Sequence, residues 1–298
     1  MSRLEGLLVA ISISDAPDRS RLGFPRREID RAVHSLCTAL VREGADIAYS
    51  GNLDPDGYTF KIFRHLAGAY ASGRDTPFRH FVPEPVGRTI RYEDLYAVLN
   101  EARGTTLTEL ARGDRFHRAR ARQDGILIDD DLLIRSDVQL AEWYSAVPRS
   151  EDSDAFSLAR RAVTDLSDAR VVLGGKMGIL DLPHDKYQGN APGIAEEAIM
   201  ALEARQPMIP LGAFGGAARD VAIALDLLSG DARVPRGGQH PTFDSAMART
   251  RELRDRIPDG LRERLSRAAS DDRSEQLAFA VAALIADWLA LSERGAAQ

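Results

Sequence analysis

Cysteine and lysine are scarce in this sequence. Its 298 residues include one cysteine, Cys37, and the 39 basic residues include only three lysines. A single thiol cannot form an internal disulfide, a multi-thiolate metal site or a dithiol redox pair. Two of the three lysines, Lys176 and Lys186, fall in one glycine-bearing segment. The lack of cysteine chemistry fits a reducing compartment, so we predict a cytoplasmic protein.

An excess of positive charge is also missing. The formal net charge is −6, which argues against a protein whose affinity comes from neutralising nucleic-acid phosphates. We therefore expect no polymeric nucleic acid as a partner. The six histidines show no H-x-x-x-H or similar spacing, so the sequence predicts no metal site.

Long hydrophobic runs are missing as well. The most apolar stretch, residues 277–291, contains Asp287 and is short for a bilayer span, which predicts a buried helix. The apolar run near the N-terminus has no small-residue cleavage site and is typical of a first strand, not of a signal peptide. We expect no membrane partner.

The sequence does contain a regular alternation of apolar runs and amphipathic stretches. Continuous apolar runs predict buried strands at residues 7–13, 45–49 and 78–82, and from residues 169 and 208. Helical spacing of apolar residues predicts helices over 26–43, 60–70, 154–165, 194–204 and 217–228. This alternation predicts an α/β fold with a doubly wound, mainly parallel Rossmann-like sheet.

The periodicity also suggests how the chain is organised. Residues 1–230 are predicted to form a Rossmann-like domain, with residues 88–150 as an insertion or lid, and residues 231–298 a helical C-terminal tail. Within the insertion, the arginine-rich stretch 115–122 (RFHRARAR) is a candidate lid over a phosphate ligand. The last helix carries an apolar stripe that would pack on its own domain, and a homodimer contact is the alternative.

Four predicted strands end in small or glycine residues. Parallel strands place their carboxyl ends at one edge of the sheet, where glycines let a phosphate approach backbone amides. One such glycine is ordinary turn geometry, but four coincident turns favour a small, nucleotide-like ligand. The candidate ligand-binding residues are Ser12, Ser14, Asp15, Ser50, Gly51, Tyr58, Gly174, Gly175, Lys176, Gly193, Gly212, Gly215 and Gly216.

The two common nucleotide fingerprints are missing from these turns. No G-x-G-x-x-G follows the first strand, and no G-x-x-x-x-G-K-[ST] occurs anywhere. An NAD-dependent dehydrogenase and a P-loop NTPase are therefore disfavoured, and we predict no cofactor.

Several segments together resemble the SLOG superfamily. They are LLVAISIS, ADIAYSGNLDPDGYT, RRAVTDLSDARVVLGGK and NAPGIAEEAIMALEARQPMIPLGAFGG. That superfamily includes the LOG-type nucleotide phosphoribohydrolases, the DNA-processing Smf/DprA proteins, the N-terminal domains of TRPM channels and the ligand-sensing domains of Thoeris-type anti-phage effectors. The resemblance implies a Rossmann-like domain that binds a nucleotide or an ADP-ribose-related ligand.

The resemblance to LOG enzymes also implies catalytic candidates. The Gly-Gly that ends a LOG strand matches Gly174 and Gly175, and the acidic pair matches Glu196 and Glu197. The LOG arginine falls at Arg160 or Arg161. In an N-glycosidase, one of the acids would activate water or stabilise the cationic transition state. Acids in a first helical turn also interact favourably with the helix dipole, so this structural role is the alternative.

The departures from the LOG pattern favour a sensor. An inserted loop, residues 176–191, separates Gly175 from Pro192, and Ile194 and Ala195 replace the compact Gly-Thr turn. This loop resembles the sensor-like and TRPM-like branches. Our leading hypothesis is ligand sensing in a bacterial nucleotide-signalling or anti-phage pathway, with a separate effector protein as partner. In a sensor, Lys176 and Lys186 would bind phosphate, and Tyr187 or Tyr58 would stack on a base.

Overall fold

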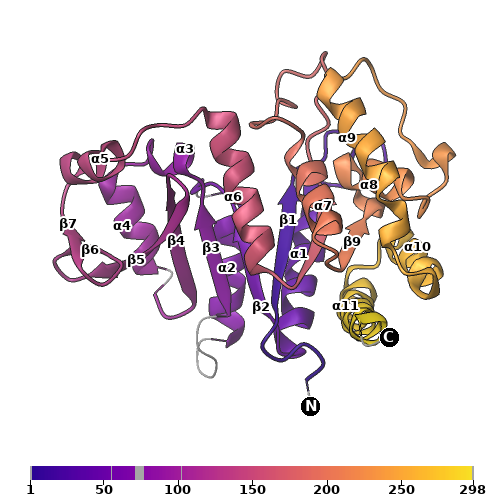
Figure 1. The fold of residues 1–298 in the computed structure, drawn as a ribbon, viewed down its shortest axis with the longest axis horizontal. Coiled ribbons are helices and arrows are strands. Elements are labelled where there is room, and N and C mark those ends of the chain that lie inside the picture. Colours follow the sequence, from indigo (N-terminus) through magenta and orange to yellow (C-terminus); the bar gives the residue numbers. More distant parts are fainter. Residues whose placement is uncertain (1, 55, 71–76, 102, 297–298) are drawn as a thin grey trace. The chain divides into compact units, whose positions relative to one another are not determined.

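The computed structural model describes residues 2–54, 56–70, 77–101 and 103–296, and it divides the chain into two compact units (Figure 1). The first unit comprises Met1–Ala45 and Thr164–Gln298. The second unit comprises Asp46–Val163. Each unit is described by itself below.

The first unit contains three parallel strands with β8 in the middle. They are β1 (Leu8–Ser14), β8 (Ala169–Gly174) and β9 (Met208–Leu211). In this register Ile11 lies beside Val171, and Val171 lies beside Ile209. All six positions of β8 are buried, as expected for a parallel strand covered on both faces.

Helices pack around these strands and also form the C-terminal tail. Helices α7 and α8 both contact β8, and α11 packs along α1. The α-helices are α1 (Arg26–Arg42), α7 (Gly193–Glu203), α8 (Gly216–Ala224), α9 (Pro241–Glu252), α10 (Arg262–Ser270) and α11 (Ser274–Ala296). Short 3-10 turns η1 (Gly212–Phe214), η2 (Gly230–Ala232), η3 (Arg254–Arg256) and η4 (Asp259–Leu261) connect them.

Helix α11 is the most apolar element of the chain. By length and composition alone, its residues Ser274–Arg294 are sufficient to cross a membrane, which is longer than the apolar stretch that the sequence suggested. In the fold, however, Val281, Ile285 and Trp288 are buried, and α11 lies against α1. This burial is the pattern of a helix in a protein core, in agreement with the expected buried helix.

The second unit contains three parallel strands followed by three strands that pair antiparallel. Strands β2 (Asp46–Ser50), β3 (Phe78–Val82) and β4 (Thr106–Arg112) run parallel. Strands β5 (Arg115–Arg122), β6 (Gly125–Ile128) and β7 (Leu132–Ile134) then add antiparallel pairs. The helices are α2 (Tyr58–Tyr70), α3 (Glu84–Gly87), α4 (Tyr92–Glu101), α5 (Asp137–Ser145) and most of α6 (Asp152–Leu166).

The segment 88–150 is an integral part of the second unit. Side chains of β4 to β7 form one apolar cluster with α4 and α5, built around Leu95, Leu110, Ile126 and Trp143. The arginine-rich stretch 115–122 forms strand β5. It pairs antiparallel with β4 on one side and with β6 on the other. Whether this segment also covers a ligand stays a prediction.

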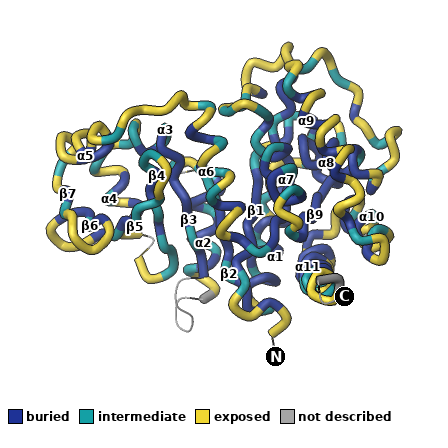
Figure 2. The backbone as a smooth tube through the Cα atoms, in the orientation of Figure 1, coloured by how far each residue is buried: buried dark blue, intermediate teal, exposed yellow. Residues whose placement is uncertain are grey.

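The predicted fold class is confirmed. Outside the run from β4 to β7, strands alternate with helices along the chain. The strands of the first unit are parallel, and the tail beyond residue 230 is helical. Figure 2 shows that burial follows this arrangement, since the strands are mostly dark blue while the loops that connect the elements are largely exposed.

Candidate functional site

The turns after β1, β8 and β9 meet at one edge of the first unit. The amide of Gly175 donates to the carbonyl oxygen of Ser14 at 3.1 Å, and the amide of Ala217 donates to the carbonyl oxygen of Gly175 at 3.1 Å. The amide of Gly216 donates to Oδ1 of Asp18 at 2.7 Å. Three turns that are distant in sequence are thus joined by main-chain hydrogen bonds at the carboxyl ends of their strands.

Glycine is required at these joints because the backbones approach so closely. Gly175 and Gly216 have φ values of +105° and +69°, in the left-handed region that favours glycine. A Cβ atom on Gly216 would lie 2.4 Å from the carbonyl carbon of Gly174, and one on Gly175 would lie 2.6 Å from Cγ1 of Ile194. These glycines therefore let the turns pack on one another, whether or not a ligand is bound.

An internal carboxylate occupies the start of α8. Asp18 is 4% exposed and accepts the Gly216 amide, and a Cβ atom on Gly215 would lie 2.5 Å from its Oδ1. Burial raises the pKa of Asp18 above its ordinary value, while the hydrogen bond from Gly216 acts in the opposite direction. The first turn of α8 thus already holds an acidic group of the protein itself.

The start of α7 is different, because its N-cap residue is Pro192. Proline has no side-chain acceptor, so the N-cap residue itself makes no side-chain hydrogen bond to this helix. The helix begins at Gly193, whose neighbour Ile194 lies against Gly175. The first-turn N–H groups of a helix and its dipole favour an anion. The start of α7 thus differs from that of α8, where Asp18 accepts the first-turn amide of Gly216.

The acidic pair on α7 divides into a half-buried and a buried residue. Glu196 lies in the first turn and is half-buried, which matches the dipole interaction expected there. Glu197 is 8% exposed, and its Oε2 lies 3.4 Å from Nη1 of Arg170. Arg170 is 2% exposed and donates to Oγ of Ser12 at 2.6 Å and to Oγ1 of Thr164 at 3.0 Å. Glu197 is therefore part of a buried polar cluster.

This cluster explains why Ser12 lies apart from the turns. Ser12 is buried within β1 as the acceptor of Arg170, whereas Ser14 and Asp15 follow at the end of the strand. Asp15 pairs with Arg19 at 3.0 Å.

Gly212 lies at a packing contact with the C-terminal tail. A Cβ atom on Gly212 would approach Leu228 and the backbone of α10, so this glycine allows η1 to pack closely against the tail.

The inserted loop after Gly175 is anchored by its own polar groups. Asp185 is buried and accepts the amides of Met177 at 3.0 Å and Ile179 at 2.7 Å. Lys176 donates through Nζ to the carbonyl oxygen of Lys186 at 2.7 Å. The two lysines that the sequence singled out are thus joined to each other, while His184 is exposed in the same loop.

A second segment, residues 233–242, is hydrogen-bonded to this loop. Gln239 donates to the carbonyl oxygen of Met177 at 2.8 Å, and the amide of His240 donates to that of Gly178 at 2.8 Å. Arg236 forms an ion pair with the buried Asp220 of α8 at 2.8 Å, and the hydroxyls of Tyr187 and Thr242 are hydrogen-bonded. The loop is therefore a folded part of the first unit.

The remaining candidates belong to the second unit. Ser50 ends β2, and the amide of Gly51 donates to the carbonyl oxygen of Phe81 at 3.2 Å. Tyr58 is buried at the start of α2, with Nζ of Lys61 5.0 Å from the centre of its ring. Arg160 lies on α6 over the ring of Phe156, and Arg161 is exposed.

Residues 3–235 match the family described as SLOG cluster2. The chain belongs to the SLOG family. This membership indicates nucleotide-related binding or processing. The curated proteins contain no match to this chain, and neither do the solved structures. Across the part of the chain that the structure describes, no group of three His, Cys, Asp or Glu side chains is placed to hold a metal ion.

Two residues of this candidate site escaped the sequence analysis. Arg170 interrupts the apolar strand ARVVLGG, and a lone arginine in a strand buried on both faces is a usable signal for a buried ion pair. Asp18 carried no such signal, because its partner Gly216 lies 198 residues away. Only the folded chain brings them together.

Proposed function

We propose that this SLOG protein binds a nucleotide or an ADP-ribose-related ligand and acts as a sensor. The main support is the meeting of the turns after β1, β8 and β9 beside the start of α7, whose N-cap residue Pro192 has no side-chain acceptor. A phosphate of the ligand would accept hydrogen bonds from the first-turn amides of α7, near Gly193. Ser14 and Lys176 border the same turns and would contact the ribose or a second phosphate.

The state of Glu197 supports sensing over hydrolysis. A catalytic carboxylate must reach the anomeric carbon of the sugar, where positive charge develops. Glu197 is instead buried and paired with Arg170, whose guanidinium is itself almost fully enclosed. Removing Glu197 from this cluster would leave an uncompensated buried charge.

The alternative is a LOG-like nucleotide N-glycosidase. It is favoured by the acidic pair in the first turns of α7, of which Glu196 is only half-buried. In this alternative Glu196 would activate water for attack on the anomeric carbon. Arg160 or Arg161 would steady the phosphate or the leaving base.

Turnover separates these two functions. The protein is incubated with nucleoside monophosphates, NAD and ADP-ribose, released base is followed by chromatography, and binding is measured by calorimetry. We expect binding of at least one of these compounds without release of base. Release of base that Glu196→Gln abolishes would establish the enzyme and contradict the sensor.

A variant of Gly193 tests the location of the ligand. Gly193→Val places a β-branched side chain at the start of α7, and we expect it to weaken binding at least about tenfold, equivalent to about 1.4 kcal/mol. Gly230→Val is the matched control, because a Cβ atom there meets no neighbour within 4 Å. Unchanged affinity of a folded Gly193→Val protein would place the ligand elsewhere.

A further inference from the structure

The second unit contains an arginine-lined pocket at the amino-terminal ends of its parallel strands. The pocket has a volume of about 650 Å³, within the range of small-molecule sites. It is lined by the first residues of β2 and β4, by Arg79 near the start of β3, and by the last residues of β5. The turns proposed above to bind the ligand follow the carboxyl ends of strands, so this pocket at the amino-terminal ends is a different site.

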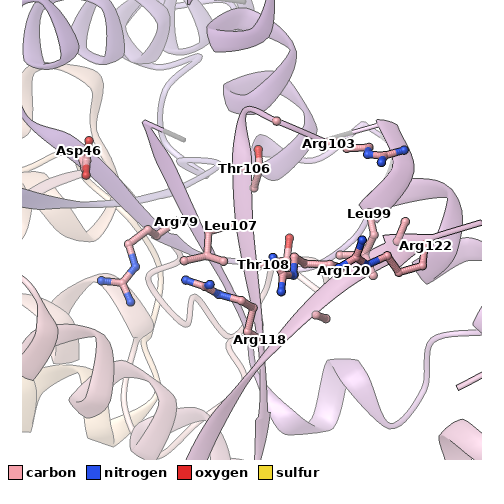
Figure 3. A pocket seen from close by; sticks show the side chains of 13 residues that line it. Asp46, Arg79, Leu99, Arg103, Thr106, Leu107, Thr108, Arg118, Arg120 and Arg122 are labelled. Carbon is pink, nitrogen blue, oxygen red and sulfur yellow. The ribbon is translucent and has the colours of Figure 1, made fainter. Parts of the chain in front are cut away.

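Five arginines contribute to this pocket, and most of them share one face of the sheet. Arg118, Arg120 and Arg122 alternate along β5, so their side chains point to the same side. Arg118 lies opposite Glu109 of β4, and Glu109 accepts from Arg79 at 3.1 Å, which places Arg79 on this side as well. Figure 3 shows the side chain of Arg118 extending toward the side of the pocket on which Arg79 lies.

The positive charge of the pocket is only partly neutralised. Arg79 pairs with Glu109, and Arg120 pairs with Asp130. Within the described ranges of the chain, the guanidinium groups of Arg103, Arg118 and Arg122 form no ion pair. Asp46 is the acidic residue that lines the pocket itself. Three unneutralised arginines in one concave site, on a chain with a net charge of −6, form a local centre for anions.

Buried polar atoms in the pocket also lack partners. Oγ1 of Thr106 and Nε of Arg79 are buried, and neither has a hydrogen-bond partner among the described residues. A buried donor without a partner is unfavourable. Arg79 lies on the face of the sheet that carries Arg118, whereas the register places Thr106 on the opposite face, together with Thr108 and Ala119. Thr108, a second hydroxyl residue, lines the same pocket.

We propose that this pocket binds a polyphosphate chain of two or more phosphoryl groups. Guanidinium groups bind phosphate oxygens in a planar, two-pronged geometry, and several of them around one cavity match an anion with several charges. A pocket of this volume encloses a compact anion, whereas a nucleic-acid strand needs an extended groove with aromatic side chains. The site is independent of the ligand turns of the first unit.

Calorimetry with sodium tripolyphosphate tests this proposal. We expect binding near one to one at low salt, and a weakening as ionic strength rises, because the arginines are partly exposed. Arg118→Gln and Arg122→Gln should each reduce affinity about tenfold, since each removes charge-assisted hydrogen bonds. Circular dichroism checks that each variant is folded.

Matched controls make the result specific. Arg115→Gln removes an exposed arginine from the other end of β5, outside the pocket, and should leave affinity unchanged. Gly193→Val should also leave it unchanged, because it alters only the turns of the first unit. ATP binding that competes with tripolyphosphate would identify a nucleoside triphosphate as a source of the chain, and binding of tripolyphosphate alone would identify a free polyphosphate.

Four outcomes would overturn the proposal. They are no binding at low salt, equal loss in Arg115→Gln, full affinity in the pocket variants, and loss of binding in Gly193→Val. A single-stranded oligonucleotide that binds through the same arginines but is not displaced by tripolyphosphate would also contradict it, in favour of a nucleic-acid surface.

Discussion

Arg170 is the residue whose placement depends most on the rest of the fold. Its side chain is 2% exposed and reaches Ser12, Thr164 and Glu197 from three other elements. A buried charge is tolerated only where hydrogen bonds and a counter-charge replace its water shell. The buried strand β8 can therefore contain an arginine only because these three partners are present.

Removing this guanidinium should destabilise the protein strongly. We expect Arg170→Met to lower the free energy of unfolding by about 3 to 5 kcal/mol, because Glu197 is left buried without its counter-charge. Urea unfolding followed by circular dichroism measures the loss. The control is Arg264→Met, which breaks a pair with Asp287 whose two side chains are about half exposed, and which should cost less than about 1 kcal/mol. Equal losses in the two variants would contradict this role.

Among the elements, the turn that opens α8 illustrates how closely the SLOG turns pack. Gly216 has a positive φ, donates to Asp18 and lies against the backbone of Gly174. The same glycine thus satisfies a backbone requirement and a packing requirement. Neither requirement involves a ligand.

A methyl group at this turn should be costly even without any ligand. Gly216→Ala should lower the free energy of unfolding by about 2 kcal/mol or more, through left-handed backbone strain and overlap with the backbone. Gly68→Ala in α2 is the opposite control: its Cβ atom meets nothing within 4 Å, so helix propensity should stabilise the protein by about 0.5 to 1 kcal/mol. A neutral Gly216→Ala would show that the turn can relax.

Helix α11 offers a second test at this scale, since its length and hydropathy alone would allow a membrane span. Trp288 is 3% exposed and Phe279 is 50% exposed on the same helix. We expect Trp288→Ala to cost about 3 to 5 kcal/mol and Phe279→Ala less than about 1 kcal/mol, both measured by chemical unfolding. Similar small losses for both would mean that α11 does not depend on its packing against α1.

For the whole molecule, two buried titratable groups affect stability with opposite signs. Burial lowers the pKa of His80 from 6.5 to about 4, and burial raises the pKa of Asp18 above 3.8. In the unfolded chain His80 takes up a proton as the pH falls below 6.5, while in the folded chain it stays neutral. His80 therefore lowers stability as the pH falls from about 6.5 toward 4, whereas Asp18 lowers it as the pH rises above 3.8.

Replacing the histidine should flatten the acid side of the stability curve. The difference between a pKa of 6.5 and one of about 4 corresponds to roughly 3 kcal/mol in full. His80→Phe keeps an aromatic ring beside Phe78 but cannot titrate, so its unfolding free energy should fall less between pH 6.5 and pH 4.5. His184→Gln changes an exposed histidine and should follow the unchanged protein. Parallel curves for all three proteins would contradict the role of His80.

Local patterns accounted for the order of the elements. The strand at residues 7–13 and the helix at 26–43 were predicted within about one residue of β1 and α1, because apolar periodicity is a property of neighbouring residues. The same patterning was weak over residues 88–150, where short antiparallel strands alternate charged and apolar positions. That is why this segment was expected as an insertion or lid, while its contribution to the sheet became visible only in the fold.

The amino-acid sequence by itself determined the fold class, the glycine-rich turns and the family, since all three depend on residues close together along the chain. Tertiary structure alone decided the partners of those residues. Asp18 meets Gly216 across 198 positions, and Arg170 meets Ser12 across 158. The alternating arginines of β5 become one charged face only when Arg79 of β3 is brought beside them through Glu109 of β4. Such contacts depend on how strands are ordered in a sheet, and local periodicity carries no information about that order.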